Sequence, residues 1–165
     1  MNNINLKDIA KELIDTFFEA GRAAKTISDQ GIKITLKEDK SPVTNADLAV
    51  DEILTKKIKK LTPQIVIISE ETVKTDISNK NENFWLIDPI DGTKEYIKKG
   101  EEYTLNAALI LNLKPEIGII YAPAKDRLFY SYGKGFAYEI KNKKEIKLNF
   151  KKKNKGKIIG LENSA

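Results

Sequence analysis

Two pairs of acidic residues stand where apolar segments end, and they are the residues of this sequence best suited to chemistry. Glu70 and Glu71 follow one apolar run, and Asp88 and Asp91 follow the next. If the two runs form neighbouring strands, the carboxylates converge. Two full charges about 5 Å apart repel by roughly 3 kcal/mol at an effective dielectric of 20. Such a cluster needs a cation, and Mg²⁺, which takes oxygen ligands and keeps room for phosphate and water, suits it.

The stretch DPID predicts how two of these acids meet. Pro89 fixes its own φ and pushes Asp88 toward extended geometry. We expect the chain to turn here, so that Asp91 comes back beside Asp88 and the carbonyl of Ile90 faces the same space. Asp-Pro-x-Asp-Gly is also ordinary turn chemistry with an aspartate cap, and two glutamates at a loop start are common surface residues. Both interpretations are open at this point.

Gly92 and Thr93 follow directly and are expected to open a short helix through Tyr96 and Ile97. Free backbone amides and the positive end of a helix dipole then point toward an anion. One turn would thus hold a metal with its acids and a phosphate with its amides.

Composition excludes other chemistry. The 165 residues contain neither cysteine nor histidine, so zinc–thiolate sites, Cys-His or Ser-His-Asp nucleophile systems and histidine acid–base catalysis are absent. The lack of cysteine suits a reducing cytoplasm, and no apolar run is long enough to span a bilayer. The net charge of +5 suits an anionic partner, although the lysines are dispersed among 24 acids.

The elements that must position these residues are read from periodicity. Helical spacing predicts amphipathic helices over residues 5–30 and after Thr44, where Asp47 completes a capping box. Apolar or alternating runs predict strands, and these lie at 32–36, 64–71, 83–88, 103–112, 116–123, 127–133, 135–140 and 146–150. Residues 72–83 are polar and are expected to form a loop. The fold class predicted is α+β, with two N-terminal helices packed on a largely antiparallel sheet.

The order of five blocks resembles a known family. SPVTNAD, IISEE, WLIDPIDGTKEYI, EYTLNAALI and GIIYAPA are similar to the motifs of the inositol monophosphatase-like superfamily of metal-dependent phosphatases. Within it, DPIDGTKEYI with EYTLNAALI most resembles the bacterial CysQ-type 3'(2'),5'-bisphosphate nucleotidases. The resemblance runs from about residue 5 to about residue 150. It implies the N-terminal half of that family's α/β sandwich.

The resemblance also implies roles for individual residues. Metal ligands would be Glu70, Asp88, the carbonyl of Ile90, and Asp91, with Asp88 bridging two Mg²⁺ ions. Catalytic residues would be Asp47, Glu70 and Thr93, where Asp47 orients the Thr93 hydroxyl so that it positions and deprotonates the attacking water. The substrate would be bound by Glu70, Ile90, Asp91, Gly92, Thr93 and Lys94.

One feature of the family is not found here. The family carries a second, C-terminal α/β domain with a WDxxAG motif, whose aspartate is a further metal ligand. The only tryptophan in this sequence is Trp85, which precedes DPIDGT. We therefore expect residues 1–150 to be the N-terminal phosphatase domain and residues 151–165 to be a basic tail or the start of the missing domain.

The activity implied is Mg²⁺-dependent removal of the 3'-phosphate of adenosine 3',5'-bisphosphate, which gives AMP and phosphate and belongs to sulfur metabolism. The alternatives are an inositol monophosphatase or sugar-bisphosphatase, or a truncated remnant that only binds metal or phosphate. A basic module for nucleic acid, resting on the lysine-rich tail, is a third reading, but no nucleic-acid partner is expected. The expected protein partner is a second copy of the chain, in a homodimer, or a complementing C-terminal fragment. The expected location is cytoplasmic, with peripheral contact at the inner membrane compatible with the lysines.

Overall fold

The computed structural model describes residues 5–71 and 82–149. Helices come first and strands follow. The elements are α1 (Leu6–Gln30), β1 (Ile34–Leu36), β2 (Pro42–Thr44), α2 (Asn45–Leu61), β3 (Val66–Ser69), β4 (Phe84–Asp91), α3 (Thr93–Ile97), β5 (Thr104–Leu111), β6 (Lys114–Ala122), the 3-10 turn η1 (Pro123–Lys125), β7 (Arg127–Tyr132), β8 (Ala137–Lys141) and β9 (Lys144–Lys147). This order confirms the predicted α+β class.

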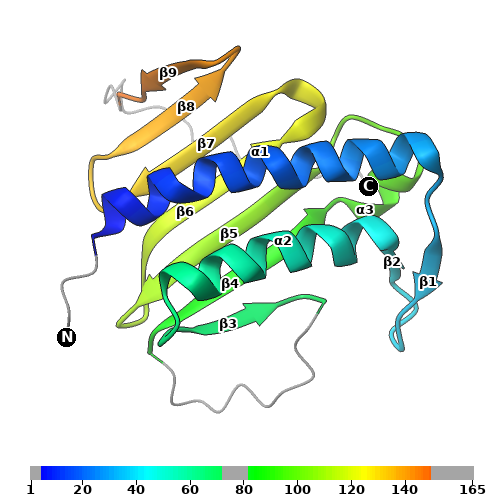
Figure 1. Cartoon of the computed structure of the whole chain (residues 1–165), viewed down its shortest axis with the longest axis horizontal. Coiled ribbons are helices and arrows are strands. Elements are labelled where there is room, and N and C mark those ends of the chain that lie inside the picture. The colour runs from blue at the N-terminus through cyan, green and yellow to red at the C-terminus, as the bar shows by residue number, and fades with distance from the viewer. Residues whose placement is uncertain (1–4, 72–81, 150–165) are drawn as a thin grey trace, which may run out of the picture.

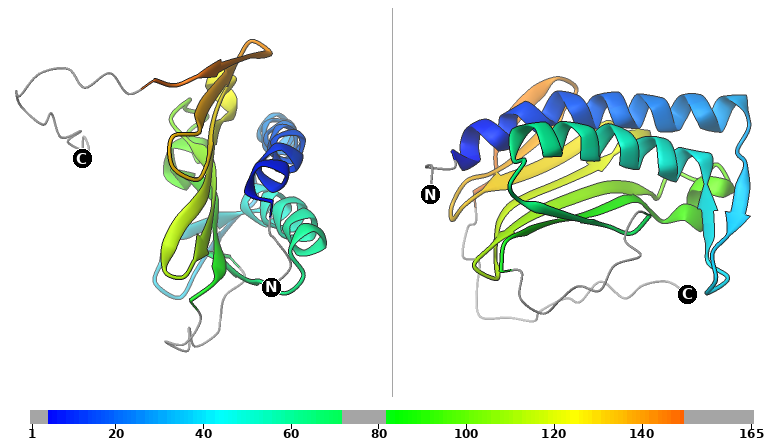
Figure 2. Two further views of the ribbon diagram at one scale, coloured as in Figure 1. Left: turned by 90° about the vertical axis from the view of Figure 1, so that its left-hand side faces the viewer. Right: turned by 60° about the horizontal axis from the view of Figure 1, so that its bottom comes forward.

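The seven strands β3 to β9 form one sheet in their sequence order. Only the β3–β4 pair is parallel, and the other five pairs are antiparallel. The two long helices α1 and α2 lie side by side across one face of this sheet (Figures 1 and 2). The predicted arrangement of two N-terminal helices on a largely antiparallel sheet is therefore confirmed.

Helix α1 forms because its apolar residues recur every three or four positions and face the sheet. Asn5 caps its start by accepting a hydrogen bond from the amide of Asp8, and Gly31 ends it with a φ of 120°. A side chain at Gly21 would place its Cβ 2.3 Å from the ring of Tyr121, so glycine lets α1 approach β6 closely. The residues that α1 buries are Ala10, Leu13, Ile14, Thr16, Phe17, Ala20, Gly21 and Ala24.

Two buried hydrogen bonds tie the helices to the sheet, one near each end of β4. The indole Nε1 of Trp85 on β4 donates to the hydroxyl of Thr62, which follows α2, at 2.9 Å. The hydroxyl of Tyr96 on α3 donates to the carbonyl of Ala24 on α1 at 2.6 Å. Both aromatic residues are almost fully buried. Each bond satisfies a polar atom that would be costly to bury alone.

The second face of the sheet is not covered by any element in the described parts of the chain (Figure 2). Strand alternation sends one set of side chains to the helices and the other set to this open face. Val66, Leu86 and Ile120 lie on strands β3, β4 and β6 and are 47–49% exposed. These residues give the open face exposed apolar surface, which is the property of a surface that packs against further polypeptide.

The expected turn within DPID is wrong, because residues 88–91 continue strand β4. Asp88 pairs with Asn106 and Asp91 pairs with Thr104, so three steps along β4 match two steps along β5. This is a β-bulge, in which one extra residue is accommodated without leaving the sheet. The turn comes one residue later, at Gly92.

Two further strand predictions differ from the structure in extent. The strand predicted over residues 146–150 is β9, which covers Lys144–Lys147. The strand predicted over residues 32–36 is shorter, covering Ile34–Leu36, and pairs with β2 as an exposed hairpin rather than joining the main sheet. Most of the predicted loop 72–83, and the predicted tail 151–165, lie outside the described residues. Among the helices that are described, none is both long and apolar enough to cross a membrane.

Candidate metal and phosphate site

The parallel pairing of β3 with β4 brings the two acidic pairs together. Ser69 is in register with Ile87, and the amide of Glu70 donates to the carbonyl of Ile87 at 3.1 Å. Glu70 therefore lies beside Asp88 at the carboxyl ends of both strands. The prediction that the two apolar runs are neighbouring strands is confirmed.

The bulge places Asp88 and Asp91 on the same face of the sheet. In a regular strand, residues three apart point to opposite faces. Their partners Asn106 and Thr104 are two residues apart and share a face, so the extra residue on β4 restores the match. The Nδ2 of Asn106 lies 3.4 Å from Oδ2 of Asp91. The expected proximity of Asp88 and Asp91 is thus achieved by a bulge instead of a turn.

Two buried oxygens in this cluster have no hydrogen-bond partner in the described residues. They are Oδ1 of Asp88 and Oδ1 of Asn106, and these two residues are paired across β4 and β5. Buried polar atoms are normally satisfied, and an exception needs an explanation such as an ion or water. An oxygen-binding cation would satisfy such atoms.

The electrostatics of the cluster also favour a bound cation. Burial, followed by the negative charges of Glu70 and Asp91, raises the pKa of Asp88 to about 7. The charge of Asp47 contributes in the same direction. A carboxyl that resists ionisation because of its neighbours gains from any cation that neutralises them.

Asp47 is held by a capping box and uses its other oxygen toward Thr93. Its Oδ2 accepts hydrogen bonds from the amide of Thr44 at 2.8 Å and from the hydroxyl of Thr44 at 2.5 Å. Its Oδ1 accepts from the Thr93 hydroxyl at 3.3 Å. Asp47 is only 1% exposed, and burial raises its pKa. The carboxylate therefore contacts both the helix start and Thr93. The catalytic role that the resemblance gives to this pair stays a prediction.

The Thr93 hydroxyl also lies 3.0 Å from the carbonyl of Ile90. It thus stands between the buried acid of α2 and the backbone oxygen that the resemblance assigns to the metal. Gly92, which precedes it, has a φ of 91°, and a Cβ there would meet the carbonyl of Glu102 at 2.8 Å. Only glycine fits this turn without strain. Lys94 is exposed on α3, directly after Thr93.

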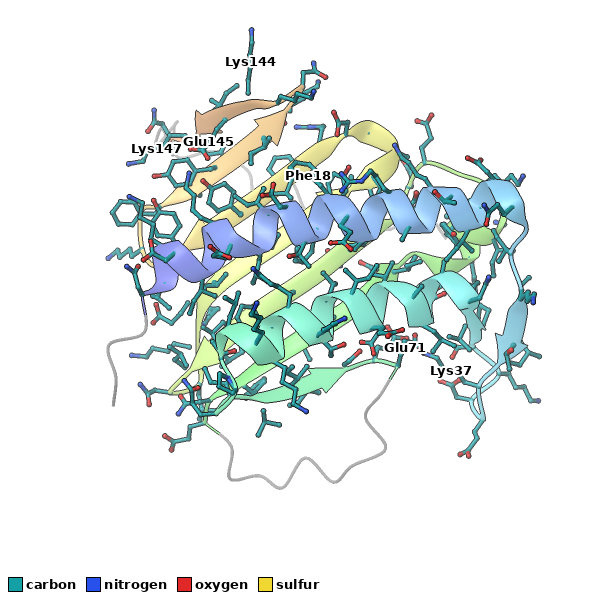
Figure 3. The ribbon with its side chains drawn as sticks, viewed as in Figure 1. Phe18, Lys37, Glu71, Lys144, Glu145 and Lys147 are labelled. Atoms are coloured by element: carbon teal, nitrogen blue, oxygen red, sulfur yellow. The ribbon has the colours of Figure 1, made fainter. Side chains whose placement is uncertain are left out.

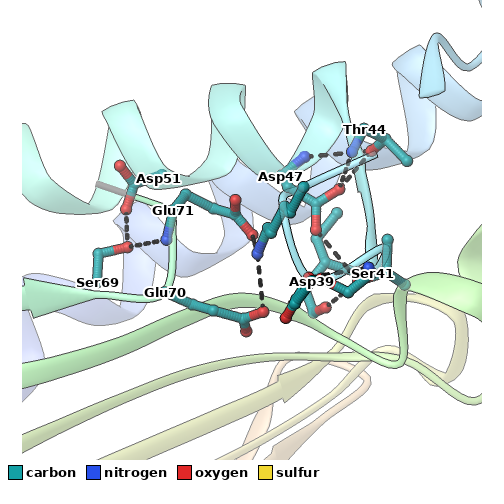
Figure 4. A network of polar contacts seen from close by, with 11 residues as sticks. Asp39, Ser41, Thr44, Asp47, Asp51, Ser69, Glu70 and Glu71 are labelled. Carbon is teal, nitrogen blue, oxygen red and sulfur yellow. Dashed lines mark hydrogen bonds and ion pairs between the residues drawn. The ribbon is translucent and has the colours of Figure 1, made fainter. Parts of the chain in front are cut away.

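A lysine that sequence reasoning overlooked lies against the cluster. Lys37, next to the β1–β2 hairpin, donates to Glu70 at 2.9 Å and to Glu71 at 2.8 Å (Figures 3 and 4). Desolvation lowers the pKa of Lys37, but the hydrogen bonds to Glu71 and Glu70 outweigh it and leave that pKa raised. Burial, helped by the charges of Asp47 and Glu70 and opposed by Lys37, leaves the pKa of Glu71 raised. The ammonium group is thus the cation that the glutamates contact in this structure.

The donor set fits a hard cation. No group of three acidic side chains within residues 5–71 and 82–149 is arranged to hold a metal ion as the side chains stand. One oxygen of Glu70 lies 2.9 Å from the ammonium group of Lys37, so part of the cluster already has a cationic partner. The available donors are nevertheless carboxylates, a backbone carbonyl and an unpartnered buried oxygen, which are the ligands that Mg²⁺ takes. The metal roles of Glu70, Asp88, Ile90 and Asp91 remain predictions.

Three polar residues of the site region were not singled out from sequence. Nothing in the sequence distinguishes Lys37 from the other lysines, so it gave no signal of a functional role. Asn106 had one, since it is a polar residue inside an apolar strand run, and its pairing with Asp88 follows from strand register. Asp51 also had one, since it lies four residues after Asp47 on the same helix and shares its face.

The α+β fold and the acidic cluster suit a metal-dependent phosphatase, and comparison with known proteins identifies the family. The chain matches the inositol monophosphatase family over residues 3–162 and belongs to that family. The similar curated proteins include the 3'(2'),5'-bisphosphate nucleotidase CysQ of Aggregatibacter actinomycetemcomitans, which is 32% identical over 144 residues, and that of Salmonella typhimurium, which is 37% identical over 133 residues. These alignments cover 86% and 78% of this chain but 54% of each relative.

Solved structures agree with the fold. The CysQ protein of Bacteroides thetaiotaomicron superposes with a TM-score of 0.65 at 29% identity, covering 99% of this chain and 54% of that one. A staphylococcal inositol monophosphatase gives a TM-score of 0.74 at 21% identity over 82% of this chain and 51% of its own, which supports the fold alone. The chain therefore spans about half the length of the relatives it matches.

Proposed function

We propose that this chain provides the metal- and phosphate-binding half of a Mg²⁺-dependent phosphomonoesterase. The proposed reaction removes the 3'-phosphate of adenosine 3',5'-bisphosphate and gives AMP and phosphate. The observation that carries the proposal is that the register of β3 with β4 brings Glu70 beside Asp88, whose carboxyl also feels the charges of Asp91 and Asp47. Asp47 in turn is hydrogen-bonded to Thr93. The nucleotidase relatives support the choice of substrate, because they are named for this activity and resemble the chain at 31–38% identity.

The chain's own residues would divide the work. Glu70, Asp88, Asp91 and the Ile90 carbonyl would hold the cation. Bound there, Mg²⁺ would neutralise phosphate charge and lower the pKa of a bound water.

Asp47 would keep the Thr93 hydroxyl aimed at the attacking water and accept its proton through that hydroxyl, since a raised pKa suits a carboxylate to proton transfer near neutrality. Glu70 would assist from the other side of the cluster. The Gly92 and Thr93 amides would bind the phosphate and Lys94 would add positive charge.

Lys37 has a place in this scheme that follows from its contacts. Its ammonium group pairs with Glu70 and Glu71 in the structure, so cation binding by Glu70 has to displace it or share the carboxylate. The released ammonium would then lie at the rim of the phosphate position, where positive charge favours an anionic substrate.

The open sheet face supports the proposal that full turnover needs more polypeptide, so that these residues alone turn over substrate more slowly than the complete enzyme. Val66, Leu86 and Ile120 expose about half of their surface on the face opposite the helices. We propose that this face packs against the counterpart of the remaining half of the relatives' length, either in the same chain or as a complementing C-terminal fragment. Residues 1–150 would then form one domain of the complete enzyme. A homodimer is the other proposed way of covering the same surface.

Two other functions are specified by particular observations. Similarity to the inositol monophosphatase of Anabaena, which is 27% identical with a TM-score of 0.67, keeps an inositol monophosphatase or a sugar-bisphosphatase as an alternative. The half-length match favours a second alternative, a chain that binds metal or phosphate without turnover. We propose a cytoplasmic location, with peripheral contact at the inner membrane as a further proposal.

The test is phosphate release from adenosine 3',5'-bisphosphate and, in parallel, from inositol 1-phosphate. The full chain is assayed with Mg²⁺ and with EDTA, as wild type, as Asp91→Asn and as Asp15→Asn. Asp15 is an exposed acid on the outer side of α1 and provides a matched control for the loss of one charge.

The proposal expects Mg²⁺-dependent release from the adenosine compound that Asp91→Asn reduces at least 100-fold and Asp15→Asn leaves unchanged. Faster release from inositol 1-phosphate would favour the alternative substrate class. Mg²⁺ binding without release, lost in Asp91→Asn, would favour the binding-only alternative. Release that persists undiminished in Asp91→Asn would overturn the assignment of the site.

A further inference from the structure

A buried acid outside the assigned site, Asp51, forms the start of a hydrogen-bond chain into it. Asp51 on α2 is 3% exposed and accepts a hydrogen bond from the hydroxyl of Ser69, the last residue of β3, which is 1% exposed. The same hydroxyl oxygen accepts from the amide of Glu71 at 3.3 Å. Figure 4 shows the two hydrogen bonds that join Asp51 to Ser69 and Ser69 to Glu71, with Glu70 beside them.

The arrangement repeats that of Asp47 one helical turn earlier. Asp47 and Asp51 are four residues apart and so lie on one face of α2. Asp47 contacts Thr93, just after the end of β4, and Asp51 contacts Ser69, at the end of β3. Because β3 and β4 are parallel neighbours, one helix face holds the carboxyl ends of both strands.

The consequence for the acidic cluster follows from chain geometry. Glu70 stands between Ser69, whose hydroxyl is fixed by Asp51, and Glu71, whose amide is fixed by Ser69. Its own amide is fixed by the carbonyl of Ile87 at 3.1 Å. Fixing the backbone on both sides of Glu70 limits the directions in which its carboxylate can point. The side chain of Glu71, 4% exposed, is held in the same way beside Lys37.

We propose that Asp51 is a positioning residue, which acts through Ser69 to hold Glu70 and Glu71 in the direction that the metal cluster requires. This inference rests on the proposed function, because it gives Glu70 a cation to bind. Residues that orient metal ligands through hydrogen bonds typically affect metal affinity by 10–100-fold. Asp51 would act as a hydrogen-bond acceptor, so the amide oxygen of asparagine would serve in its place.

Mg²⁺ affinity is the measurement, by isothermal titration calorimetry on the full chain. Ser69→Ala removes the linking hydroxyl, Asp51→Leu removes the acceptor, and Asp51→Asn keeps it. The control is Thr62→Val, which removes a buried hydrogen bond between the end of α2 and β4, through Trp85, away from the acidic cluster. Hydrogen exchange of the Glu71 amide is recorded on each protein without metal.

The inference expects Ser69→Ala and Asp51→Leu to weaken Mg²⁺ binding about 10-fold or more and to speed exchange of the Glu71 amide. Asp51→Asn is expected to stay within about 3-fold of wild type, and Thr62→Val to change neither quantity. If Asp51→Leu fails to fold, Ser69→Ala carries the same test.

Wild-type affinity in Ser69→Ala, or an equal loss in Thr62→Val, would overturn the role of Asp51 and leave the proposed function standing. An unchanged exchange rate for Glu71 in Ser69→Ala would overturn that role whatever the metal does. A wild-type chain that does not bind Mg²⁺ would overturn the proposed function and this role with it.

Discussion

Ionisation of Asp88 should make the metal-free protein less stable as the pH rises. The folded-state pKa of Asp88 is raised from its ordinary value of 3.8 to about 7 by burial and by the charges of Glu70 and Asp91. Between these two values the folded protein binds more protons than the unfolded chain. Its stability is therefore full below about pH 4 and falls until about pH 7.

The size of this loss follows from the shift. About three pKa units correspond to about 4 kcal/mol at 1.36 kcal/mol per unit. The cluster opens to water at Glu70 and Asp91, both of which are more exposed than Asp88, so screening reduces the effect to about 2 kcal/mol. Asp88→Asn cannot ionise, and its amide can donate to the unpartnered Oδ1 of Asn106 across the strand pair. The variant should lose this part of the pH dependence.

The assay is urea unfolding in EDTA at pH values from 4 to 8. Trp85 is the only tryptophan and is fully buried, so its fluorescence reports the loss of the core. The difference between wild type and Asp88→Asn isolates Asp88 from other acids that titrate in the same range. Asp15→Asn is the control and should keep the wild-type slope. Equal unfolding free energies for wild type at pH 5 and pH 8, or a fall that Asp88→Asn preserves, would refute the reasoning.

Two further predictions concern turnover and metal affinity. Thr93→Ala should lower kcat by about 10²-fold or more in the complete enzyme, a typical loss for a proton-transfer group. Mg²⁺ affinity should stay within a few-fold, because the hydroxyl contacts Asp47 and the Ile90 carbonyl and acts on the water. Calorimetry that shows a parallel loss of Mg²⁺ binding would count against this role. Lys37→Met should strengthen Mg²⁺ binding several-fold, because an ammonium group no longer competes for Glu70. The effect corresponds to about 1 kcal/mol for a half-exposed ion pair. Weaker binding in titrations of this variant would show that Lys37 supports the site instead of competing with the cation.

The strands and helices could largely be predicted from sequence because their patterns are strong. The apolar spacing of α1, the Thr44–Asp47 capping box and the short runs after Tyr103 each correspond to an element of the structure. Convergence of Glu70 with Asp88 was predicted from strands that end in acids, and the register of β3 with β4 provides it.

The turn at DPID was wrong for a physical reason. Pro89 has no amide hydrogen, which argues against a regular strand. A bulge tolerates that loss and keeps residues 88–91 in the sheet. Bulges depend on the partner strand, so local sequence does not reveal them.

The contacts of Lys37 and Asp51 were beyond sequence reasoning for a similar reason. Lys37 reaches Glu70 and Glu71 from a hairpin more than thirty positions earlier in the chain. Asp51 reaches Ser69 across the helix–sheet interface. The spacing of Asp51 from Asp47 indicates a shared helix face, but only the folded packing determines which residues these charged side chains meet.

The central claim is that acids from two strands gather to bind a divalent cation. Its most direct test is anomalous scattering from crystals of the chain soaked in Mn²⁺, which prefers the same oxygen ligands as Mg²⁺. The account predicts a peak contacting Asp88 and Asp91, with the carboxylate of Glu70 turned from Lys37 toward the ion. Ordered density for all three acids with no anomalous peak among them at saturating Mn²⁺ would contradict it.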